Sequence, residues 1–116
     1  MTENERVAYD EDLAGRIREL IGGEKALSEK RMFGGLAFLI GGNMAISASG
    51  QGGLLVRVDP AKSDQLTTGP HVEVAIMRER EMPGWLRVDA AGVKTTAQLQ
   101  RWVTESVTYA RSLPAK

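Results

Sequence analysis

The chain has 116 residues, a length typical of one domain that buries its own core. Fifteen Lys and Arg residues balance fifteen Asp and Glu residues, so no net charge attracts polyanions over long distances. There is no cysteine, which excludes disulfides, thiolate metal sites and cysteine nucleophiles. We therefore expect a single domain over residues 1–116, with residues 1–8 frayed.

The sequence gives no sign of membrane insertion or export. The N-terminus has neither the basic start nor the apolar stretch of a signal peptide. The longest mostly apolar run, Phe33–Ile46, contains four glycines and is too short to span a bilayer. We expect a cytoplasmic protein without a membrane partner.

The first half of the chain begins with a helix and continues with strands. Apolar residues recur at helical spacing from Tyr9 to Ile21, with Asp10 as the N-terminal cap and Gly22-Gly23 as the end. Two apolar strands, Leu36–Ile40 and Met44–Ala48, then flank glycines that favour a tight hairpin turn.

Further strands follow in the second half. Leu54–Val58 has the alternation of a strand, and Asp59 with Pro60 can open a short helix that runs through Leu66. Val72–Ile76 alternates apolar and polar residues as another strand. We interpret the next stretch, residues 77–84, as a connecting loop, and residues 85–89 as a further strand.

A C-terminal helix closes the chain. Thr95 and Gln98 have the spacing of a capping box, an apolar stripe follows, and Pro114 ends the helix. The predicted fold is α+β: an antiparallel β-meander of about five strands with the N- and C-terminal helices packed on it.

The sequence offers little material for catalysis. His71 is the single histidine, and neither an orienting carboxylate nor a nucleophile is evident beside it in the sequence. The paired glycines precede strands, whereas phosphate-cradling loops precede helices. We expect no catalytic residue, no metal site and no cofactor, which favours a protein that is not an enzyme.

Arginines gather in and beside the predicted strands, and two interpretations of them are open. The residues are Arg31, Arg57, Arg78, Arg80 and Arg87. A sheet face that carries them together with Trp85 can hold single-stranded nucleic acid through stacking and phosphate contacts. Alternatively, the nearby acidic residues pair with them across strands, and Trp85 belongs to the core or to an interface.

Several short motifs occur in an order that resembles a known family. They are Met32-Phe33-Gly34-Gly35, Asn43-Met44, Leu55-Val56-Arg57-Val58, Arg80-x-Met82-x-Gly84-Trp85 and Ala110-Arg111-Ser112-Leu113-Pro114. The set is similar to the N-terminal domain family of the competence regulator TfoX, also called Sxy. Members often have glycine where this chain has Glu79. The resemblance implies a member without the C-terminal helical domain of the two-domain regulators.

The resemblance implies a regulatory or interaction module that acts through macromolecular contacts. We expect a protein partner, including a second copy of the chain, and nucleic acid as the alternative partner. The expected surface centres on residues 77–84. Its residues are Arg31, Phe33, Arg57, Arg78, Arg80, Met82, Trp85 and Arg87.

Overall fold

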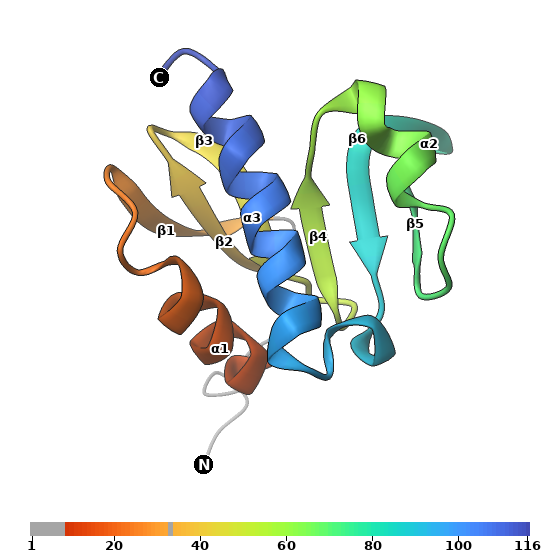
Figure 1. Cartoon of the computed structure of the whole chain (residues 1–116), viewed down its shortest axis with the longest axis horizontal. Coiled ribbons are helices and arrows are strands. Elements are labelled where there is room, and N and C mark those ends of the chain that lie inside the picture. Colours follow the sequence, from red (N-terminus) through yellow and green to blue (C-terminus); the bar gives the residue numbers. More distant parts are fainter. Residues whose placement is uncertain (1–8, 33) are drawn as a thin grey trace.

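The computed structural model of the chain describes residues 9–32 and 34–116. Two longer helices pack on a six-stranded antiparallel sheet, which confirms the predicted α+β class (Figure 1). In chain order the elements are α1 (Glu11–Ile21), β1 (Leu27–Met32), β2 (Gly35–Ile40), β3 (Asn43–Ala48), β4 (Leu54–Arg57), η2 (Pro60–Lys62), α2 (Ser63–Leu66), β5 (Val72–Met77), β6 (Arg80–Val88), η3 (Ala90–Val93) and α3 (Thr96–Ser112). The strand order is β1-β2-β3-β4-β6-β5, so β1 and β5 are the edges.

The predicted local signals form as expected. Asp10 accepts hydrogen bonds from the first backbone N–H groups of α1, and both hydrogen bonds of the Thr95–Gln98 capping box are present. Gly41 and Gly42 form the two-residue turn between β2 and β3 with φ of +59° and +85°. Both angles are left-handed, so glycine suits this turn.

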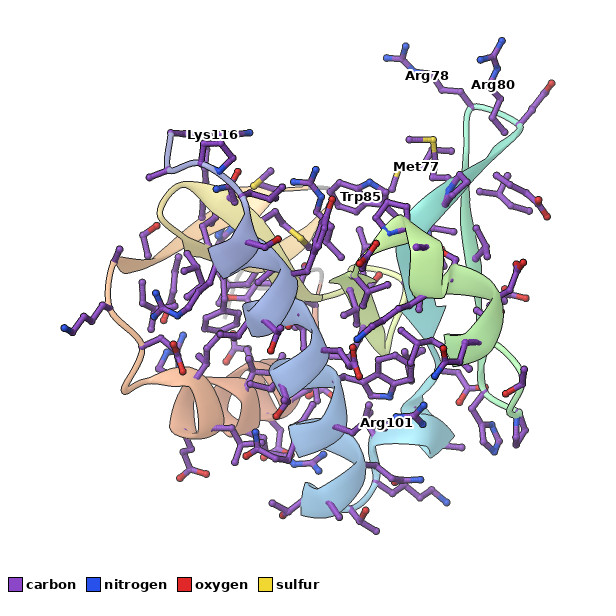
Figure 2. The ribbon with its side chains drawn as sticks, turned by 45° about the horizontal axis from the view of Figure 1, so that its top comes forward. Met77, Arg78, Arg80, Trp85, Arg101 and Lys116 are labelled. Carbon is purple, nitrogen blue, oxygen red and sulfur yellow. The ribbon has the colours of Figure 1, made fainter. Side chains whose placement is uncertain are left out.

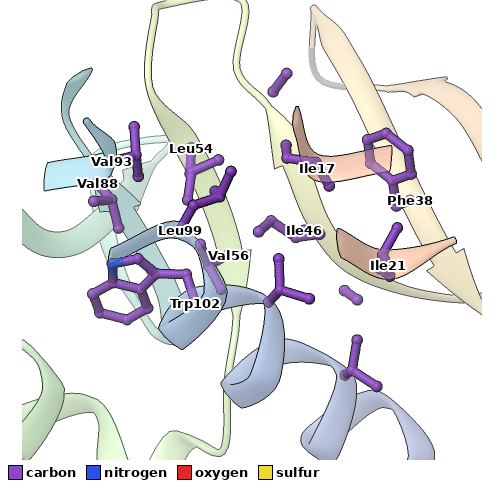
Figure 3. Packing of buried hydrophobic residues seen from close by; sticks show 14 of the residues in the cluster. Ile17, Ile21, Phe38, Ile46, Leu54, Val56, Val88, Val93, Leu99 and Trp102 are labelled. Carbon is purple, nitrogen blue, oxygen red and sulfur yellow. The ribbon is translucent and has the colours of Figure 1, made fainter. Parts of the chain in front are cut away.

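The main core lies between the sheet and the two long helices. α1 and α3 lie on the same face of the sheet (Figure 1). Ile17 from α1 and Trp102 from α3 belong, with Phe38 and Leu54 of the sheet, to one buried cluster (Figure 3). Each such side chain contributes about 1.5–3 kcal/mol through burial. No helix within residues 9–32 and 34–116 has the length and apolar character needed to cross a membrane.

The other face of the sheet has a second, smaller cluster built from strand residues. Its buried members are Ala37, Leu39, Met44, Leu55 and Ala75, with Met32, Met77 and Trp85 packed against them. Register shifts interrupt the β2–β3 and β5–β6 ladders. Such irregularities bend a strand locally and increase its twist.

Two parts of the structure differ from the prediction. The predicted loop 77–84 is wrong, because β5 and β6 continue through it and join at a two-residue turn. Strand β1 was not predicted, since this edge strand is mostly polar and exposed. The expectation for residues 1–8, and the site residue Phe33, lie outside the described residues.

Candidate functional site

The β5–β6 hairpin ends in a tip formed by residues 76–81. Met77 pairs with Arg80, so Arg78 and Glu79 alone make the turn. Their φ angles are +52° and +66°, a left-handed conformation that L-residues rarely adopt. Such strain persists only where the surrounding structure imposes it, and it concentrates at functional sites.

The tip projects from the body of the protein and carries an exposed apolar side chain. Ile76 is 62% exposed and is the one large hydrophobic residue among the described residues that is this accessible. Arg78 and Arg80 point away from the protein at the end of the hairpin (Figure 2). Residues 78–81 read Arg-Glu-Arg-Glu, so the tip has no net charge.

Gly84 attaches the base of the hairpin to the rest of the fold. Its φ is +88°, and a Cβ there would lie 2.9 Å from Cγ of Pro60. Its N–H donates to Oγ of Ser63 at 2.6 Å, and its carbonyl accepts from the N–H of Val58 at 2.7 Å. The family-like Gly-Trp pair therefore has a physical reason, because Gly84 sets the position of Trp85.

Trp85 and Arg57 form one cluster together with α3. The two residues are direct cross-strand partners between β6 and β4. The Arg57 guanidinium lies 5.2 Å from the centre of the Trp85 ring and 5.6 Å from that of Tyr109 on α3. Each cation–π contact of this kind stabilises by about 0.5–1 kcal/mol at an exposed site. Arg57 is thus already engaged within the protein.

The remaining predicted site residues lie in separate parts of the sheet. Arg87 is half-buried at the far end of β6, where it donates to Oγ of Ser49 at 3.2 Å. Arg31 lies on edge strand β1, opposite Leu36 of the main core, at the other side of the sheet from β5. Met82 is half-buried in the irregular part of β6. The structure therefore joins Arg78 with Arg80 and Arg57 with Trp85, but the five arginines share no single surface.

A histidine–aspartate pair was missed by the sequence analysis. His71 Nδ1 lies 3.1 Å from Oδ1 of Asp89, which supplies the orienting carboxylate that the sequence did not reveal. The proximity of His71 and Asp89 follows only from the register of β5 and β6, because the pairing of Val72 with Val88 brings their neighbours together. No group of three or more His, Asp or Glu side chains within the described residues is placed to hold a metal ion.

An ion pair between α1 and β1 shifts the pKa of its carboxylate. Arg18 on α1 donates two hydrogen bonds, at 2.7 and 2.9 Å, to the carboxylate of Glu29 on β1. The hydrogen bonds from Arg18 hold the pKa of Glu29 below its ordinary value. Burial opposes them to a lesser degree, and the attraction between the two charges adds a still smaller lowering. This pair joins α1 to the edge strand and lies away from the hairpin tip.

Comparison with known proteins places the chain in a family. No curated protein and no solved structure matches it significantly. The family model described as the TfoX N-terminal domain matches residues 19–110, which include all six strands of the sheet and most of α3. The chain belongs to the TfoX N-terminal domain family.

Proposed function

We propose that this chain is a non-enzymatic regulatory module of the competence-regulator type that works by binding another protein. Its contact surface is the hairpin tip, residues 76–81. The observation that carries the proposal is the exposure of Ile76 at 62% on a projecting, strained hairpin. Arginine is enriched in protein interfaces, and Ile76 adds an exposed apolar contact on the same hairpin tip as two arginines.

The charges near the tip favour a protein partner over nucleic acid. Glu79 and Glu81 cancel the charges of Arg78 and Arg80, whereas phosphate binding depends on an excess of cations. The Arg57 guanidinium contacts two aromatic rings, which leaves it less available for phosphate. The module acts in the cytoplasm, and a second copy of the chain is the first partner to test.

The test compares three baits that carry the wild-type chain, Ile76→Ser and Gln100→Ser. Gln100 is exposed on α3, away from the hairpin, and serves as the matched control. Partners from the native cytoplasm should bind to the wild-type and Gln100→Ser baits and be lost with Ile76→Ser. Sedimentation of the same three proteins tests self-association in parallel. Equal retention by all three baits, together with equal sedimentation, would refute the assigned surface.

Nucleic acid is the alternative partner, and its binding is measured in a separate experiment. Anisotropy titrations with labelled single-stranded RNA and DNA at low and high salt measure the affinity of the chain for nucleic acid. Binding that weakens steeply with salt, and that disappears when Arg78 and Arg80 are both changed to Gln, would replace the protein-binding proposal with the nucleic-acid one.

A further inference from the structure

A cleft at the opposite end of β5 from the tip has the features of a small-molecule site. It has a volume of about 280 Å³ and lies between the loop after α2 and the first turns of α3. Its apolar wall includes Leu66, Val72 and Val88, and Trp102 lines it from α3. This size and mixture of side chains suit a small organic ligand.

The Trp102 indole supplies an unused hydrogen-bond donor. The residue is only 3% exposed, and its Nε1–H donates no hydrogen bond to any described residue. No side-chain nitrogen or oxygen in the described part of the chain is both sealed from solvent and unpartnered. The Trp102 nitrogen therefore keeps some contact with solvent, and the residue is one of those that line the cleft. Figure 3 shows this nitrogen on the edge of the ring nearest Val88 and Val93.

The charge that faces the cleft is positive. Arg101 lines it, and the Arg101 guanidinium lies 4.9 Å from the centre of the Trp102 ring. Within the described residues Arg101 forms no ion pair, and no Asp or Glu lines the cleft. A neighbouring cavity of about 300 Å³ differs in this respect, since Glu73 and Asp89 line it beside Arg87. His71 lies in the wall of both cavities.

We infer that the cleft binds a small organic anion with an apolar body, such as a carboxylate or a phosphate monoester. Arg101 pairs with the anionic group, the Trp102 Nε1–H donates to one of its oxygens, and the Leu66–Val88 wall holds the apolar part. Charge-assisted hydrogen bonds of this kind are stronger than neutral ones, so the anionic group sets the affinity. This site is independent of the hairpin tip and adds a ligand to the proposed interaction module.

Nuclear magnetic resonance of the ¹⁵N-labelled chain tests the inference. The two indole N–H signals are assigned with a Trp85→Phe variant, and the protein is titrated with benzoate and with phenyl phosphate. Benzyl alcohol and benzylamine serve as neutral and cationic probes of the same shape. We expect a saturable shift of the Trp102 signal with the two anions, with dissociation constants on the order of millimolar for probes this small.

Charge-removal variants locate the anion. Arg101→Gln, at an exposed position, should weaken benzoate binding about tenfold, the loss expected for one charge-assisted hydrogen bond. Arg78→Gln, the matched control at the hairpin tip, should leave it unchanged. The inference is overturned if neither anion shifts the Trp102 signal, if benzylamine binds as well as benzoate, or if the two variants have equal effects. None of these results depends on whether the hairpin tip binds a protein.

Discussion

Replacing Glu79 with glycine should stabilise the protein. Glu79 has a φ of +66° in the turn of the β5–β6 hairpin, and no hydrogen bond or ion pair holds its side chain within the described residues. A left-handed conformation costs an L-residue about 1–2 kcal/mol, whereas glycine adopts it freely. Glycine also makes the unfolded chain more flexible, which offsets about 0.4–1 kcal/mol. The net gain is about 0.5–1 kcal/mol, or a rise in Tm of about 2–5 °C.

Thermal and urea unfolding of the wild type, Glu79→Gly and Glu81→Gly measure this effect. Glu81→Gly is the matched control, because it removes the same side chain from an extended position paired with Ile76. Glycine within a strand should lower stability by about 0.5–1 kcal/mol. A fall in Tm for Glu79→Gly, or equal changes for the two variants, would refute the argument that the turn stores strain.

Three further substitutions test other parts of the structure. Gly84→Ala should destabilise by more than about 2 kcal/mol in urea unfolding, since its Cβ would meet Pro60 in a left-handed backbone; a loss under 1 kcal/mol would contradict this. Glu29→Gln should lower Tm slightly at neutral pH. Because the pKa of Glu29 is lower in the folded state, its ionised carboxylate stabilises the fold at pH values above the unfolded-state pKa. This stabilisation is lost as the pH falls through the folded-state pKa, so the difference in Tm should vanish in acid. A difference that stays constant with pH would count against the Arg18 pair. Thr95→Ala should cost about 1 kcal/mol and Thr95→Ser much less, and equal losses would argue against the capping hydrogen bond.

The elements that were predicted correctly have local chemical signals. The N-terminal cap Asp10, the capping box at Thr95 and the Gly41-Gly42 turn each act within a few residues, so the sequence alone reveals them. The hairpin at Arg78-Glu79 lacks such a signal, because neither residue is a usual left-handed turn former. Strand β1 was missed for a related reason, since an exposed edge strand shows no apolar alternation.

The candidate site depended on contacts that are distant in the sequence. Arg57 and Trp85 were both predicted as site residues, but their contact follows only from the pairing of β4 with β6. Tyr109 joins them from α3 and was not identified. Ile76 was assigned to a strand, and its exposure arises because the hairpin continues past the core, which periodicity alone does not show.

Site-specific photo-cross-linking tests the central claim most directly. A photoreactive amino acid replaces Ile76 at the tip in one variant and Gln100 on α3 in the other, and both are expressed in the native cell. We predict protein adducts at position 76, to a second copy of the chain or to another protein, and none of these adducts at position 100. Adducts that only a nuclease removes, or the same protein adducts at both positions, would contradict the assignment of the hairpin tip as a protein-binding surface.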